Sequence, residues 1–145
     1  MMDNRGVASS LNYILGLGIA TVLVVGLLIA GGNLIEDQRE QVVRNELSVL
    51  GQQMVSDIST ADRFTAEGGE ITIERDLPKL VAGEHYRITV VQDAPNEYSL
   101  LLRTSRTDIT VQIAFRAESS ITESSVDGGS VSIVGDGSTV EVQNG

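Results

Sequence analysis

The sequence contains no cysteine and no tryptophan, and its 145 residues include a single histidine, His85. The absence of cysteine excludes disulfide bonds and thiolate metal sites. His85 has no second histidine with which to bind zinc, and the sequence suggests no nucleophile or orienting carboxylate to make it a catalytic base. Phosphate-binding loops, dinucleotide fingerprints and nucleophile elbows are also missing. We therefore expect no enzymatic activity, no cofactor and no metal.

Two short acidic stretches contain the oxygen ligands that calcium binds. Asp127-Gly128-Gly129 and Asp136-Gly137 resemble fragments of oxygen-ligand loops. An EF-hand requires acids at alternate positions and a closing glutamate, which neither stretch has. We interpret both stretches as turns.

Positive charge is scarce. The chain has 20 Asp and Glu against 10 Lys and Arg, a net charge of −10, and Lys79 is its only lysine. Binding to nucleic acid requires a basic surface, so we expect no nucleic-acid partner. Acid excess with little lysine resembles the composition of proteins from extreme halophiles, in which salt screens the repulsion between like charges. The alternative is an ordinary acidic surface that keeps the protein soluble.

The longest feature is an uncharged run of 29 residues, Val7–Ile35. Its core, Leu11–Ala30, contains 12 residues of Leu, Ile or Val. As a helix, these 20 residues would span about 30 Å, the thickness of the hydrocarbon core of a bilayer. Arg5 lies before the run and an acidic segment follows it, so the positive-inside rule places the N-terminus in the cytoplasm. We expect a single-pass membrane protein with its C-terminal domain outside.

Three fates are open for this run. A cleaved secretory signal has an apolar core of 7–15 residues, which is shorter than the run found here. A permanent single-span anchor needs only the run itself. In the third case, cleavage falls before the run and leaves it on the mature protein.

The third case is supported by Arg5, Gly6 and Val7, which stand where the run begins. A charged residue, then Gly, then a long uncharged run resembles the leader of archaeal type IV pilins and pilin-like proteins. The resemblance implies that a prepilin peptidase cuts after Gly6 and that Val7 begins the mature chain. It also implies a structural subunit that packs with itself or with other pilin-like subunits, in the membrane or in a surface pilus. The chain differs from bacterial pilins at Leu11, where they usually carry glutamate.

Small residues are expected to matter for packing between such helices, because they let backbones approach closely. The candidate assembly residues in this run are Leu11, Gly16, Ala20, Gly26 and Ala30. Glycine is also more frequent in membrane helices generally, which is the alternative explanation.

A second helical pattern follows the apolar run. An apolar stripe recurs at spacings of three and four residues through Val43, Leu47, Leu50, Met54 and Ile58. This spacing places the stripe on one face of an amphipathic helix. We predict one long helix from about Leu11 to about Arg63, with Gly31-Gly32 as a possible hinge or break. A simple membrane anchor does not require this stripe. Its apolar side chains need another part of the chain to pack against.

From residue 67 onward the apolar period changes from helical to two. Six alternating segments are predicted as half-buried strands, near residues 71–73, 86–90, 98–102, 109–115, 131–133 and 140–142. Short turns between them favour antiparallel neighbours, in a sheet of five to seven strands or a small sandwich. We expect Gly135-Asp136-Gly137 to form the last turn, and the Ser-rich segment 117–129 to be mainly an irregular connection or else an edge strand.

The predicted architecture is α+β: one long N-terminal helix packed on a C-terminal antiparallel β domain. The predicted parts are a leader (1–6), an apolar helix (7–35), an amphipathic helix (36–66) and the β domain (67–145). The residues favour two classes of function. One is a pilin-like structural subunit, and the other is a membrane-anchored binding or adhesion protein that does not polymerise.

Overall fold

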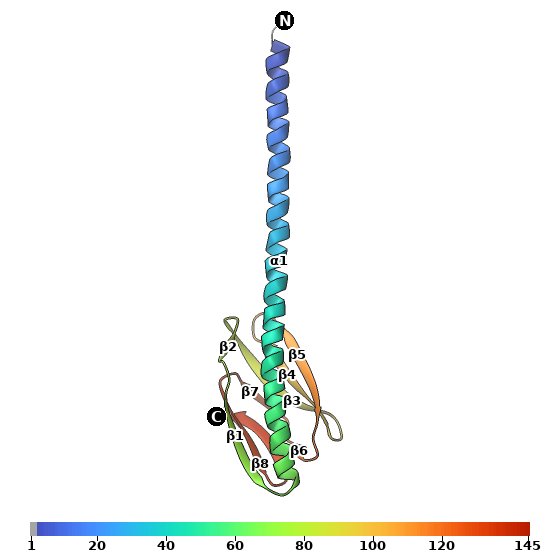
Figure 1. Cartoon of the computed structure of the whole chain (residues 1–145), viewed down its shortest axis with the longest axis vertical. Coiled ribbons are helices and arrows are strands. Elements are labelled where there is room, and N and C mark those ends of the chain that lie inside the picture. Colours follow the sequence, from blue (N-terminus) through green and yellow to red (C-terminus); the bar gives the residue numbers. More distant parts are fainter. Residues whose placement is uncertain (1–2) are drawn as a thin grey trace. The chain divides into compact units, whose positions relative to one another are not determined.

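The structure is a computed structural model that describes residues 3–145 (Figure 1). Helix α1 runs from Asp3 to Ala66. It starts earlier than the predicted Leu11, because the residues before Leu11 include no proline and a single glycine does not stop a helix. It is also continuous through Gly31 and Gly32. A helical glycine costs about 1 kcal/mol relative to alanine, which a helix of this length tolerates.

Nine strands follow in the described part of the chain. They are β1 (Glu70–Asp76), β2 (Leu80–Val81), β3 (Glu84–Ala94), β4 (Glu97–Thr104), β5 (Thr110–Arg116), β6 (Ser120–Ile121), β7 (Ser124–Asp127), β8 (Ser130–Asp136) and β9 (Thr139–Asn144). The α+β class is confirmed. The strands form two sheets, one in the order β1-β8-β9-β6 and one in the order β2-β3-β4-β5, with β7 also paired to β3. All pairs are antiparallel except β6 with β9.

The segment 117–129 differs from the preferred prediction of an irregular connection. It contains β6 and β7, and Ile121 and Val126 are both buried. Strand β7 pairs with β3, where the Ser125 hydroxyl lies 3.1 Å from that of Thr89. The prediction was wrong because serine is uninformative about strands, whereas here a hydroxyl pair across two strands supports the pairing.

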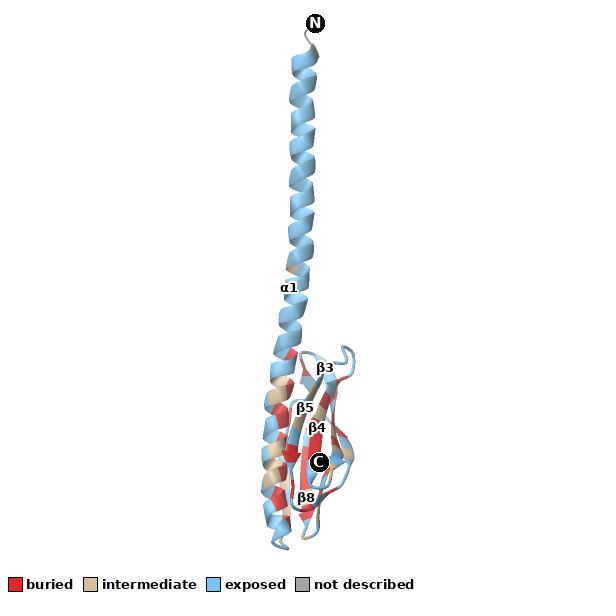
Figure 2. Cartoon of the chain, turned by 90° about the vertical axis from the view of Figure 1, so that its right-hand side faces the viewer, coloured by how far each residue is buried: buried red, intermediate tan, exposed pale blue. Residues whose placement is uncertain are grey.

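The chain divides between Arg39 and Glu40 into two compact units. In the second unit, the C-terminal part of α1 packs on the sheets and shares one hydrophobic core with them (Figure 2). The five residues of the predicted stripe are all buried there, and Leu47, Met54 and Ile58 are fully inaccessible. Gly51 lies within this face, and a Cβ atom at this position would come 2.5 Å from Ile113 Cδ1. A glycine therefore lets the helix approach β5 closely.

The last turn consists of Gly137 and Ser138, so the prediction was right for Gly137 and wrong for Gly135 and Asp136, which belong to β8. Gly135 belongs to β8 and is buried against Thr65 at the end of α1, where a Cβ would meet the threonine hydroxyl. The turn itself is at Gly137, whose φ of 87° favours glycine. Asp136 closes it by accepting hydrogen bonds from the backbone and hydroxyl groups of Ser138 and Thr139. These bonds hold the pKa of Asp136 well below its usual value.

Candidate functional site

The first unit presents an apolar surface. From Val7 to Ala30 every residue of α1 is exposed, and Tyr13 and Leu27 are each 72% exposed (Figure 2). The helix is long and apolar enough to cross a membrane, and none of its most apolar stretch is buried by other described residues. A stretch of aliphatic side chains of this size in water is unfavourable, so the segment requires a covering environment from outside the chain.

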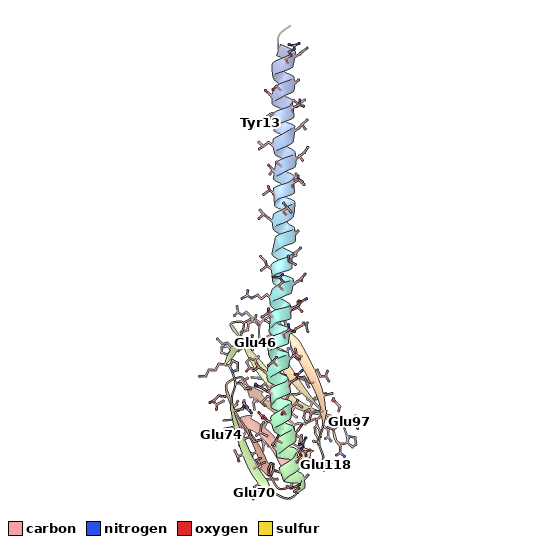
Figure 3. The ribbon with its side chains drawn as sticks, viewed as in Figure 1. Tyr13, Glu46, Glu70, Glu74, Glu97 and Glu118 are labelled. Atoms are coloured by element: carbon pink, nitrogen blue, oxygen red, sulfur yellow. The ribbon has the colours of Figure 1, made fainter. Side chains whose placement is uncertain are left out.

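The few polar groups in this segment suit an apolar environment. The Thr21 hydroxyl donates to the carbonyl of Leu17 at 2.8 Å, so the helix itself satisfies it. Tyr13 projects from the helix near one end of the run (Figure 3). The acidic segment that starts at Glu36 follows the other end, 23 residues later, or about 35 Å along a helix. Tyrosine and charged residues are typical of the two boundaries of a membrane segment.

The candidate assembly residues lie on this exposed surface. Leu11 is 55% exposed. Gly16 and Gly26 have open space around the position of a Cβ, and each is followed one turn later by an alanine, Ala20 or Ala30. These positions are therefore free for a neighbouring helix.

The predicted cleavage site lies in the first turns of α1. Met1 and Met2 of the predicted leader lie outside the described residues, and Asp3–Gly6 are helical. Arg5, Gly6 and Val7 are exposed, and beyond the neighbouring backbone of the helix no described atom lies within 4 Å of a Cβ placed at Gly6. The scissile bond expected after Gly6 is thus unobstructed by other described residues.

Two aspartates in the C-terminal part of α1 bond to the β unit, one to strand β1 and one to the connection between β5 and β6. Asp57 forms a two-pronged ion pair with Arg75 of β1, with distances of 2.8 and 2.7 Å, which raises the pKa of Arg75. Asp62 is 6% exposed and accepts hydrogen bonds from the backbone N–H groups of Glu118 and Ser119, at 3.0 and 2.7 Å. The apolar stripe predicted from the sequence includes neither Asp57 nor Asp62. The signal in the sequence is that each aspartate directly adjoins a buried residue of the helix, Ile58 or Ala61, which places it at the edge of the packed face.

Tyr86 and its surroundings form a buried polar contact at the other end of the β unit. The Tyr86 hydroxyl donates to the carbonyl of Pro78 at 2.6 Å. Burial, with a smaller contribution from Glu46, raises the pKa of Tyr86 to about 12. Its neighbour His85 is exposed on β3. No group of three or more potential metal ligands was found in residues 3–145.

The fold and the apolar surface define a class: an α+β protein whose N-terminal helix is compatible with a single-pass membrane anchor. The chain belongs to a family of unknown function (DUF7266), whose model matches residues 2–144. Comparison with curated proteins and with solved structures finds no match.

Proposed function

We propose that this protein is a pilin-like structural subunit. Its N-terminal helix is held in the cell membrane, its β domain is displayed outside, and the subunits assemble into a type IV pilus-like filament. The observation that carries this proposal is the helix itself. The same α1 that supplies buried residues to the core of the β unit also carries a 29-residue uncharged run, whose residues 7–30 are all exposed.

The energetics favour insertion of the run. Twelve aliphatic residues at about −0.3 to −0.6 kcal/mol each contribute on the order of −4 to −7 kcal/mol on the insertion scale. The charges at the two ends support the orientation. Arg5 stays on the cytoplasmic side, and the segment Glu36–Glu40, with three acids and one arginine, stays outside.

Cleavage after Gly6 gives the helix a second environment. An arginine at the centre of a bilayer costs about 2.5–3.5 kcal/mol, so Arg5 holds the N-terminal end at the cytoplasmic surface. Removal of residues 1–6 takes away both Asp3 and Arg5. The mature helix can then leave the bilayer and pack among the helices of other copies, where Gly16 and Gly26 permit close approach.

The experiment that tests this function is the recovery of filaments from the surface of cells that express the full chain. We expect sheared surface material to contain the protein in filaments visible by electron microscopy with a specific antibody. A Gly6→Ile variant, which blocks the cleavage site, should remain in the membrane. The matched variant Gly18→Ile changes a glycine inside the run and leaves the cleavage site intact, so it should still be cleaved. Recovery of wild-type protein solely as membrane-bound monomer would contradict the proposal and favour a non-polymerising anchor.

A further inference from the structure

The β unit has two long strands that end its sheets. Strand β1 is at one edge of the first sheet, and β5 is at one edge of the second. In Figure 1 they lie on opposite sides of this unit, β1 on the left and β5 on the right. Each has seven residues and pairs with a strand on one side only within residues 3–145. An unpaired edge is a template on which another strand can add.

The hydrogen bonds around β1 show which of its backbone groups are free. Leu77 N donates to Gly129 O, in register with the β1–β8 ladder. Alternate residues of an antiparallel strand point their N–H and C=O groups toward the same neighbour. The odd-numbered residues of β1 therefore bond to β8. The residues whose backbone N–H and C=O groups point away from β8 are Thr72, Glu74 and Asp76, with Glu70 at the start of the strand.

The same reasoning applies to β5. Thr104 N donates to Ile109 O, and Ala117 N donates to Asn96 O, at the two ends of the β4–β5 ladder. The odd-numbered residues of β5 therefore bond to β4. The residues whose backbone N–H and C=O groups point away from β4 are Thr110, Gln112, Ala114 and Arg116. Among the described residues, one group reaches this edge: Arg44 Nη1, which lies 3.4 Å from Thr110 O.

The two edges run in opposite directions. Thr110, at the start of β5, is bonded to Arg44 of α1, and Ser119, just after its end, is bonded to Asp62. Strand β5 therefore runs in the same direction as α1. Strand β1 starts four residues after α1 ends, and its Arg75 reaches back to the helix, so β1 runs against α1. In two copies with the same orientation, β5 of one copy is antiparallel to β1 of the next.

We propose that β5 of one copy pairs with β1 of the next copy, in a head-to-tail contact that continues the sheet from subunit to subunit. This inference rests on the proposed function and names the contact through which the displayed domains associate. The outward residues pair as Thr110 with Asp76, Gln112 with Glu74, Ala114 with Thr72, and Arg116 with Glu70. This register matches the seven residues of each strand without an overhang.

The side chains in this register are complementary. Arg116 is 82% exposed at its side chain, and its guanidinium, which already binds Glu97, has further donors for Glu70. The Nε2 group of Gln112 already donates to Ser99 Oγ at 2.9 Å and has a second hydrogen that can donate to the Glu74 carboxylate. Figure 3 shows Glu70 and Glu74 on one side of the unit and Glu97, which marks the Arg116 edge, on the other.

The charges also select between the possible pairings. Residues 110–115 of β5 carry no charge in a chain of net charge −10, so this edge lets an acidic neighbour approach. Two β1 edges would place Glu70 opposite Asp76 in the equivalent antiparallel register, and like charges opposite each other are unfavourable. A heterologous contact of this kind does not close on itself unless its rotation forms a ring, so it can propagate as a filament.

Disulfide cross-linking tests the contact directly, because the natural chain contains no cysteine. Thr72 and Ala114 form one of the expected pairs, with Cα atoms about 5.5 Å apart in such a ladder, which is within the range for a disulfide. Oxidation of cells that express the full-length Thr72→Cys/Ala114→Cys variant should give a ladder of dimers, trimers and larger species. Each single variant should remain monomeric, and co-expression of the two single variants should stop at dimers.

A matched control places the second cysteine away from the edge. Glu141 is exposed on β9, pairs with Val134 of β8 and does not belong to either strand of the proposed contact, so Glu141→Cys/Ala114→Cys should give only background cross-linking. Arg116→Glu should reduce the ladder of the Thr72/Ala114 pair several-fold, and addition of Glu70→Arg should restore it, because the charges are then exchanged.

The remaining outcomes separate the contact from the function. Filaments that form without a ladder would overturn the β1–β5 contact and leave the proposed function standing. Dimers from Gln112→Cys/Ala114→Cys, which has no cysteine on β1, would overturn it in favour of β5 pairing with itself. Absence of both filaments and ladder would overturn both proposals.

Discussion

Substitution of Leu50 by aspartate tests whether the apolar stripe of α1 holds the β unit together. Leu50 is 7% exposed in the core, whereas its neighbour Val49 is 60% exposed on the same helix. The pair Leu50→Asp and Val49→Asp therefore introduces the same charge at adjacent positions that differ in burial.

The expected magnitudes differ widely. Loss of the buried leucine removes about 1.5–3 kcal/mol of hydrophobic stabilisation. An unpaired carboxylate in the same place costs several kcal/mol more. Because a small domain is stable by about 5–15 kcal/mol, Leu50→Asp should remove much of its folding free energy. Val49→Asp should change stability by no more than about 0.5 kcal/mol, and Leu50→Ala should cost about 2–5 kcal/mol.

Hydrogen exchange of the full chain in detergent, measured by mass spectrometry, reports the two units separately. We expect the amides of β1, β4 and β8 to exchange much faster in Leu50→Asp than in the natural chain, with Leu50→Ala between them. The apolar segment 7–35 should exchange equally in all variants. Equal protection of the strands in Leu50→Asp and Val49→Asp would refute the packing of this stripe on the sheets.

Three further predictions concern the β unit. Asp62→Ala should lower the unfolding free energy by about 2–4 kcal/mol, measured by denaturant titration, because the buried N–H of Ser119 and the part-buried N–H of Glu118 lose their acceptor, and Asp62→Asn should cost less. Stability should fall as the pH rises from about 10 to about 12, because Tyr86 stays protonated in the folded state and ionises in the unfolded state. Tyr86→Phe should flatten that fall, as followed by circular dichroism, and an equally steep fall in this variant would assign it to another group. The melting temperature should rise between about 0.1 and about 1 M KCl, because salt screens the repulsion within a chain of net charge −10, and a flat or falling curve would contradict this.

Most of the architecture follows from periodicity. The helical spacing of Val43 to Ile58 and the alternation in six strands depend on burial against one core, which leaves a regular pattern in the sequence. Short elements were harder to predict. Strand β7 holds one buried apolar residue, Val126, and is supported by its pairing with β3, which is a contact between distant parts of the chain.

Close approaches between elements also leave little trace in a sequence. Gly51 and Gly135 are glycines because another element lies where a side chain would be, and only the packed structure shows this. The role of Asp62 is also hard to predict from the sequence, because its backbone partners lie 56 and 57 residues later in the chain. The apolar run, in contrast, could be identified from composition alone, because its surroundings are outside the chain.

The N-terminus of the mature protein tests the central proposal most directly. It can be measured by mass spectrometry on protein isolated from the membranes of its native cells. A chain that begins at Val7 and retains the whole apolar run is the predicted result. A chain that still begins at Met1 would contradict pilin-like processing, and one that begins near Gly31 would show that the run is a removed signal and is absent from the mature protein.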